Sequence, residues 1–161
     1  YYALYSNTTG SNNTANGYVA LYSNTTGSNN TANGYYAGRT YFDGTASVDL
    51  TVANSCVFIG YGSKASNDSA SNQIVIGANS VGAGNNSVVL GNGAITLCQT
   101  YGALRSVGVT VAALGTAPEG SIRFATNGRK VGESAGAGTG VPVYYSNGKW
   151  RVLSTDAEVA S

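Results

Sequence analysis

Short apolar runs recur along the middle of the chain, each closed by a glycine and followed by a polar stretch. Three of them align, at residues 56–60 (CVFIG), 73–77 (QIVIG) and 87–91 (SVVLG). Apolar runs of this length, bounded by Gly, Asn and Ser, are typical of buried strands separated by turns. The pattern therefore predicts degenerate repeats over residues 55–98, with one short strand of about five residues in each apolar run.

A second, stricter repeat fills the start of the chain. Residues 3–17 and 20–34 carry the same letters, ALYSNTTGSNNTANG, so that residues 1–34 have a period of 17. A fixed short period indicates a solenoid, in which each repeat adds one coil. Ordering the backbone of a coil costs ~1–2 kcal/mol for each of its residues. Each of its few buried side chains contributes only ~1.5–3 kcal/mol, so a single coil is not stable. The coils must therefore stack, and we expect an all-β parallel β-roll or β-solenoid over residues 1–101, with roughly six coils.

The apolar runs of the degenerate repeats are apolar at consecutive positions, as in residues 57–59 and 74–76. Strands of this kind are buried on both faces. One face is expected to fill the interior of the coil and the other to need a partner surface, for which self-association is the simplest source. The residues predicted to form the structural core of the repeats are Val57, Ile59, Ile74, Ile76, Val88 and Leu90.

The pattern of residues changes after residue 101. Alternating valines at residues 107–111 indicate a strand, and residues 132–140 (GESAGAGTG) indicate a glycine-rich turn. Asn-Gly between two strand-like runs is the strongest short signal for a hairpin, here over residues 143–153. The sequence thus predicts a small antiparallel β module over residues 102–161, following the repeat region.

Composition narrows the class of protein. Gly, Asn, Ser and Thr supply nearly half of the chain, and only 9% of the residues are charged, against about 25% in a typical domain. Twelve tyrosines and 42% hydrophobic residues argue against disorder. A net charge of +1 without a basic block argues against nucleic acid as a partner, and no apolar run of ~18 residues is present for membrane insertion. The chain starts within a repeat, which suggests a fragment or a trimmed product.

The sequence offers little catalytic chemistry. It contains no histidine, the commonest general base and metal ligand, and its seven carboxylates are scattered without the pairing of a glycosidase. The glycine-rich segment lacks the Lys-Ser/Thr ending of a phosphate-binding loop. Cys56 and Cys98 lie in unrelated contexts and are expected to be packed thiols, although a single bridge between them stays open. We expect a protein that is not an enzyme and that has no metal or other cofactor.

The repeats resemble those of a known class of adhesin. Residues 74–80 (IVIGANS) and 86–94 (NSVVLGNGA) look like the head repeats of trimeric autotransporter adhesins, and SNTTGSNNTANGY is similar to repeats in such heads and in bacteriophage tail fibres. The resemblance covers about residues 1–98 and implies a parallel β-roll that forms a homotrimer. Related phage-type repeats usually carry Val where Asn16 and Asn33 stand. These amides either face the trimer axis, where they stack or hold water or an anion, or are simply solvated.

The C-terminal part of the sequence carries a second resemblance. PEGSIRFATNG followed by VPVYYSNGKWRVL is similar to a module near the ends of phage tail-fibre and related virion fibre proteins. Together the resemblances imply a structural fibre protein at the virion surface that contributes to host attachment. Its implied partners are further copies of itself, other fibre or baseplate proteins, and a host polysaccharide or receptor. The head of a bacterial trimeric adhesin, a purely structural extracellular filament and a spike hydrolase remain as alternatives.

Receptor contacts are expected from aromatic and basic residues of the C-terminal module. Tyr and Trp rings stack on apolar sugar faces, and basic groups bind the carboxylates or phosphates of surface polymers. The candidates for contact with a receptor or glycan are Tyr144, Tyr145, Lys149, Trp150, Arg151, Arg129 and Lys130. In the alternative, alternation along the strand places Trp150 and Val152 in the core of the hairpin.

Overall fold

The structure is a computed structural model that describes residues 1–95, 97, 99, 122–125, 141–147 and 149–152. These residues form strands and turns, and none of them lies in a helix. The chain divides into two units, Tyr1–Cys98 and Gln99–Ser161. The predicted all-β fold is confirmed.

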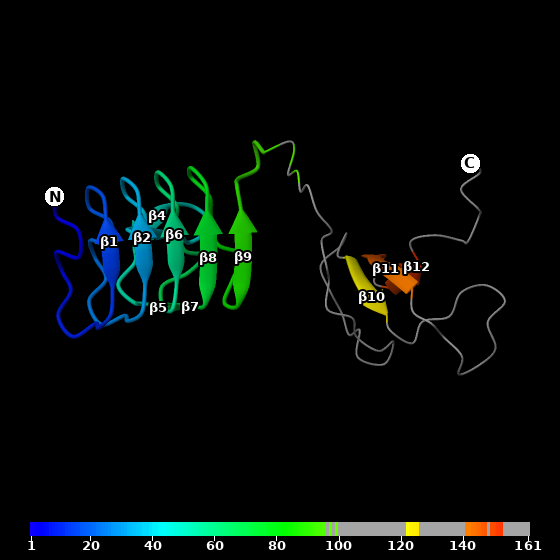
Figure 1. The fold of residues 1–161 in the computed structure, drawn as a ribbon, viewed down its shortest axis with the longest axis horizontal. Helices are drawn as coiled ribbons and strands as arrows, with labels where there is room; N and C mark the ends of the chain where they lie inside the picture. The colour runs from blue at the N-terminus through cyan, green and yellow to red at the C-terminus, as the bar shows by residue number, and fades with distance from the viewer. Residues whose placement is uncertain (96, 98, 100–121, 126–140, 148, 153–161) are drawn as a thin grey trace. The chain divides into compact units, whose positions relative to one another are not determined.

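The first unit is a parallel β-solenoid of about five turns (Figure 1). Its main sheet has the strand order β1-β2-β6-β8-β9, so that each turn contributes one strand next to the strand of the previous turn. The strands of this sheet are β1 (Thr14–Asn16), β2 (Thr31–Asn33), β6 (Val57–Ile59), β8 (Gln73–Ile76) and β9 (Ser87–Leu90). The strands are shorter than the expected five residues, and there are five of them where the sequence suggested six coils.

The turns of the solenoid differ in length. Hydrogen bonds between equivalent positions of neighbouring turns join residues 17, 26, 17 and then 14 apart along the chain. The long turn contains an antiparallel hairpin that the sequence did not predict, formed by β3 (Thr40–Phe42) and β4 (Ser47–Asp49). Two short strands, β5 (Ala53–Asn54) and β7 (Ala70–Ser71), pair in parallel on another wall of the solenoid.

The interior of the solenoid is narrow and is lined mainly by small side chains. The central position of each main-sheet strand points inward, and register places these residues in one column: Ala15, Ala32, Phe58, Val75 and Val89. Phe58 and Val75 are fully buried, as are Leu21 and Leu50 from other walls of the turns. Alternation along a strand then turns the flanking positions outward.

The predicted core of the repeats is corrected by this arrangement. Val57, Ile59, Ile74, Ile76, Val88 and Leu90 lie on the outward side of the main sheet and are half-buried or exposed. The physical reason is that a run of consecutive apolar residues places apolar side chains on both faces of a strand. Such a run does not indicate which face lines the interior of the coil. Within a single chain the interior is formed by the alternate residues, Phe58 and Val75.

Asparagine side chains join one turn to the next inside the solenoid. The Asn24 side chain accepts a hydrogen bond from the Ala53 backbone N–H at 3.0 Å and donates one to the Gly27 carbonyl at 2.9 Å. In the same way, Asn30 accepts from the Cys56 N–H at 2.9 Å. Both asparagines are buried, and buried amides stabilise a fold when they are hydrogen-bonded. The polar repeats are therefore structural rather than only solvated.

Glycine closes each main-sheet strand because the turns approach closely there. Gly34 has a φ of +136°, and a Cβ built on it would lie 2.7 Å from the Gly60 carbonyl oxygen of the next turn. Only glycine combines this backbone conformation with so short an approach. The glycines that ended the apolar runs in the sequence thus mark the stacking points of the solenoid.

The second unit contains a three-stranded antiparallel sheet. Its strands are β10 (Ile122–Ala125), β11 (Val141–Ser146) and β12 (Lys149–Val152), in the order β10-β11-β12. β11 and β12 flank Asn147, whose φ of +51° is the left-handed conformation that an Asn-Gly hairpin turn needs. The small antiparallel module is confirmed, and the predicted hairpin is present up to residue 152. The segments 107–111 and 132–140 lie outside the described residues.

Candidate functional site

The backbone register brings together the predicted contact residues of the C-terminal hairpin. Tyr144 pairs with Arg151 and Tyr145 with Trp150 across β11 and β12, and Lys149 begins β12. Arg129 and Lys130 lie outside the described residues. The hairpin therefore carries an aromatic and basic group of residues on adjoining strands.

The outward side of the main sheet forms a continuous surface, which we call the outer face. It consists of two columns of residues that the strand register aligns. The first column is Thr14, Thr31, Val57, Ile74 and Val88, and the second is Asn16, Asn33, Ile59, Ile76 and Leu90. The outer face is polar on the first two turns and apolar on the last three. Its apolar part is open to solvent in the single chain, since Ile59 is 37%, Val88 62% and Leu90 60% exposed.

The register also places the two unusual asparagines. Asn16 and Asn33 stand in the same column as Ile59 and are exposed in the single chain. A partner that covers the isoleucines along this column is therefore adjacent to the amides as well. The structure thus assigns Asn16 and Asn33 to the outer face and not to the coil interior.

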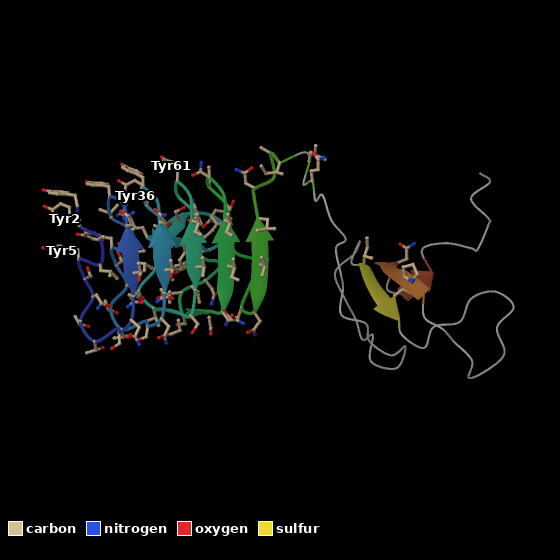
Figure 2. All side chains as sticks on the ribbon, viewed as in Figure 1. Tyr2, Tyr5, Tyr36 and Tyr61 are labelled. Atoms are coloured by element: carbon tan, nitrogen blue, oxygen red, sulfur yellow. The ribbon has the colours of Figure 1, made fainter. Side chains whose placement is uncertain are left out.

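A ladder of tyrosines runs along another edge of the solenoid (Figure 2). The rings of Tyr1, Tyr18, Tyr35 and Tyr61 stack in series with centroid separations of 5.9, 5.3 and 5.4 Å. The last three follow the strand-closing glycines, so that stacking of the turns places each ring above the next. A shorter stack joins Tyr5 to Tyr22 at 5.3 Å. Stacked rings of this kind contribute about 0.5–1.5 kcal/mol per pair beyond their burial.

The ladder alters the acidity of its own phenols. A hydrogen bond with the Tyr36 side chain, together with desolvation beside the neighbouring rings, raises the pKa of Tyr35 to about 12. The Tyr1 hydroxyl donates a hydrogen bond to the Tyr2 hydroxyl at 3.2 Å, which raises the pKa of Tyr1 in the same direction. The phenols of these two residues therefore stay neutral through the physiological range.

We expect the Tyr35 phenol to titrate near pH 12 in the folded chain. The comparison is between the phenolate absorbance of the wild type and that of Tyr35→Phe, because their difference isolates one phenol among twelve. The folded chain binds more protons than the unfolded chain between about pH 10 and 12, so this contribution to stability is complete below about pH 10 and is lost as the pH rises to about 12. Tyr36→Phe removes the hydrogen bond and should lower the pKa of Tyr35. A difference titration centred near pH 10 in the wild type would contradict the described ladder.

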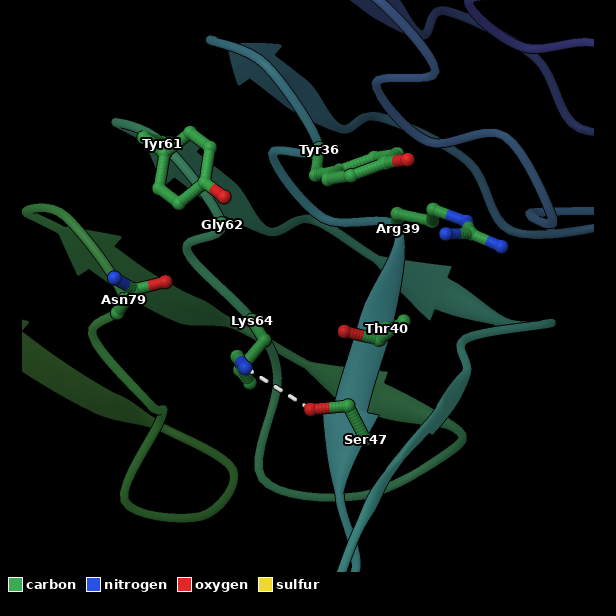
Figure 3. A pocket seen from close by; sticks show the side chains of 8 residues that line it. All are labelled: Tyr36, Arg39, Thr40, Ser47, Tyr61, Gly62, Lys64 and Asn79. Atoms are coloured by element: carbon green, nitrogen blue, oxygen red, sulfur yellow. Dashed lines mark hydrogen bonds between the residues drawn. The ribbon is translucent and has the colours of Figure 1, made fainter.

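Two adjoining hollows lie beside the ladder, and we call them together the tyrosine groove. They have volumes of about 240 and 210 Å³ and share Tyr36 and Arg39. The first is lined by Tyr2, Tyr18, Val19, Tyr22, Tyr36 and Arg39. The second, shown in Figure 3, is lined by Tyr36, Arg39, Thr40, Ser47, Tyr61, Gly62, Lys64 and Asn79. The unpredicted β3–β4 hairpin supplies part of its wall, through Thr40 and Ser47.

Two cationic side chains line the second hollow. The Arg39 guanidinium lies 5.0 Å from the centre of the Tyr36 ring and 3.6 Å from an Asp49 carboxylate oxygen. The Lys64 ammonium donates a hydrogen bond to the Ser47 hydroxyl at 3.0 Å (Figure 3). Sequence reasoning placed no contact residue here, although one signal was present: the first charged residue of the chain, Arg39, occurs where the 17-residue period breaks.

The described residues show neither a metal centre nor a membrane span. Within these parts of the chain, no three His, Cys, Asp or Glu side chains gather as metal ligands would. No helix long and apolar enough to span a membrane occurs among the same residues. Cys56 is a buried free thiol, and Cys98 lies outside the described residues.

No protein-family model, curated protein or solved structure matches the chain.

Proposed function

We propose that this protein is a structural segment of a fibre on a virion surface, which assembles as a homotrimer and contributes to attachment to the host cell. The resemblance of the repeats and of the C-terminal module to phage fibre proteins supports the kind of fibre. The observation that carries the assembly is the outer face, whose last three turns expose a continuous apolar surface in the single chain.

Self-association removes this surface from water. Burial of apolar area contributes roughly 25 cal/mol per Å², and among the described residues of the first unit none forms a second layer over the exposed side chains of the main sheet. In a closed symmetric assembly the same columns of each copy meet around one axis. The apolar residues Ile59, Ile76 and Leu90 then provide the affinity of the assembly.

The polar end of the outer face has a separate role in this assembly. Asn16 and Asn33 continue the column of isoleucines, and a polar side chain at one level of an apolar interface fixes the alignment of the copies. A copy shifted along the axis by one turn would bring Asn33 against Ile59, and its amide would lose its polar partners. In this proposal the amides set the register, and the paired residues of the β11–β12 hairpin contact the host.

The expected mass in solution is three times 16.3 kDa. The double variant Ile59→Lys/Ile76→Lys should be monomeric at the same protein concentration, because each burial of an unpaired charge costs several kcal/mol. Light scattering on both proteins measures the mass directly.

Val48→Lys serves as the matched control, because Val48 is exposed on the β3–β4 hairpin and not on the outer face. It should assemble like the wild type. A monomeric or dimeric wild type would contradict the proposed trimer. Equal masses for the wild type and the double variant would show that the outer face is not the interface.

A further inference from the structure

The tyrosine groove concentrates the positive charge of the first unit. Arg39 and Lys64 are the only basic residues before Arg105, they lie 25 positions apart in different turns, and both line the same hollow. Because neither residue is near the other in sequence, only the stacking of the turns and the excursion of the long turn bring them together. A hollow with this lining attracts an anion.

The acidic residues of this unit leave the groove with an excess of positive charge. Asp43 closes its own turn by accepting hydrogen bonds from the backbone N–H groups of Thr45 and Ala46 at 2.8 and 2.7 Å. Asp68 accepts from the N–H groups of Thr51 and Val52 at 2.8 and 3.0 Å. Neither of these carboxylates lines either hollow.

Asp49 is the remaining acidic residue of this unit, and its carboxylate lies 3.6 Å from one terminal nitrogen of the Arg39 guanidinium. The Nε of Arg39 is buried and has no hydrogen-bond partner, and it is the one buried side-chain nitrogen or oxygen in this state among the described residues. A buried donor without an acceptor is unfavourable and would be satisfied by a ligand oxygen. The Lys64 ammonium has a neutral neighbour, the Ser47 hydroxyl.

The rest of the lining suits a sugar. Figure 3 shows Tyr36 and Tyr61 along one side of the hollow, with Lys64 and Ser47 across from them. Aromatic rings pack against the C–H faces of pyranoses. Thr40, Ser47 and Asn79 offer hydroxyl and amide groups that both donate and accept hydrogen bonds, as sugar hydroxyls require. Two adjoining hollows along a row of tyrosines accept a short chain of sugar units better than a single one.

We propose that the tyrosine groove is a binding site for an acidic oligosaccharide, in which the carboxylate of a sugar acid lies at Arg39 and Lys64 and the adjoining sugar rings lie along Tyr36 and the tyrosine ladder. This inference deepens the proposed recognition of the host surface and rests on it for the source of the ligand. The binding itself requires only the groove of one chain.

The test is a calorimetric titration of the full chain with trigalacturonate, a trimer of a hexuronic acid. Its fully methyl-esterified form is the matched control ligand, because it keeps the sugar rings and removes the charges. We expect the acidic trimer to bind and the ester to bind at least tenfold more weakly. Raised ionic strength should weaken the binding of the acidic trimer, since the attraction is between exposed charges.

Variants then locate the site. Lys64→Gln and Arg39→Gln should each weaken the binding of trigalacturonate by about tenfold, which corresponds to the loss of one charge-assisted contact. Lys64→Gln is the safer variant for folding, because glutamine can still hydrogen-bond to Ser47. Arg123→Gln makes the same change of charge in strand β10, at a residue that lines neither hollow, and should leave binding unchanged. Lys149→Gln tests the C-terminal hairpin as the alternative location of the ligand. A thermal melt of each variant verifies that it is folded.

The outcomes separate this inference from the proposed function. No binding of trigalacturonate, equal binding of the ester, or full binding by both groove variants would overturn the site. If Lys149→Gln weakens binding and the groove variants do not, the ligand lies on the C-terminal hairpin, which overturns the inference and leaves the fibre proposal standing. The mass of the assembly, measured by light scattering, tests the fibre proposal independently of ligand binding.

Discussion

Replacing Phe58 with alanine should lower the free energy of unfolding by about 3–5 kcal/mol. Phe58 is the largest fully buried side chain in the described part of the chain, and it fills the interior column of the main sheet between Ala32 and Val75. Both neighbours in this column are smaller, and the backbones of the stacked turns are held at a fixed spacing by the parallel ladder. The cavity left by the ring therefore cannot collapse. Urea denaturation at a fixed protein concentration, followed by circular dichroism, measures the loss.

Phe42→Ala provides the matched control. Phe42 ends strand β3 and is 38% exposed, so the same chemical change should cost about 1 kcal/mol or less, as for other surface positions. If the two variants lose equal stability, Phe58 does not fill the interior as described. The fixed protein concentration keeps any contribution of assembly the same in both comparisons.

Replacing Asn24 with alanine should be the second large effect, although the residue is polar. The change leaves the buried Ala53 N–H without an acceptor and opens a cavity, and each buried group left unpaired costs about 1–3 kcal/mol. A loss of about 3 kcal/mol is expected by the same urea titration.

The repeat supplies its own control for Asn24. Asn7 occupies the same position of the repeat one turn earlier and makes the same hydrogen bond within its own turn, to the Gly10 carbonyl at 2.8 Å. It is only half-buried, and its oxygen accepts a long bond of 3.5 Å from the Asn24 side chain instead of one from a buried backbone N–H. Asn7→Ala should therefore cost about 1 kcal/mol. Equal losses would mean that the bond from the buried Ala53 N–H to Asn24 adds nothing to the stability of the fold.

The sequence was sufficient to predict the solenoid because residues 1–34 repeat strictly and the later apolar runs all end in glycine. These runs can be aligned without knowledge of any contact, and their strands β6, β8 and β9 lie next to one another in this order in the structure. The Asn147 hairpin was predictable for a similar reason, since a two-residue turn fixes its geometry locally.

The choice of the inner face was not predicted, although the strict repeats held the necessary information. In TAN, the central Ala15 or Ala32 is the one apolar residue, and its flanking Thr and Asn are polar. Register with the later turns puts these alanines in line with Phe58 and Val75. The apolar runs of later turns hide this alternation because their outward positions are apolar too.

The tyrosine groove could not be predicted, because it depends on distances across turns of unequal length. The 26-residue turn and its hairpin bring Arg39 and Lys64 to the same hollow. No short sequence motif predicts this turn. The hydrogen bonds of Asn24 and Asn30 could not be predicted either, because their backbone partners lie in another turn and become neighbours only when the turns are stacked.

The first two repeats, which differ only at Tyr2 and Val19, allow the length of this rod to change in whole turns. Insertion of a further 17-residue unit within residues 1–34 would keep the ring stacking, the asparagine bond within the turn and the glycine contact, because the new turn meets neighbours that match it at all other positions. Each unit changes the reach of the rod by about 4.8 Å, the spacing of neighbouring strands. Reach can thus be adjusted in equal increments while the later turns, with the second hollow and the apolar columns, keep their shape.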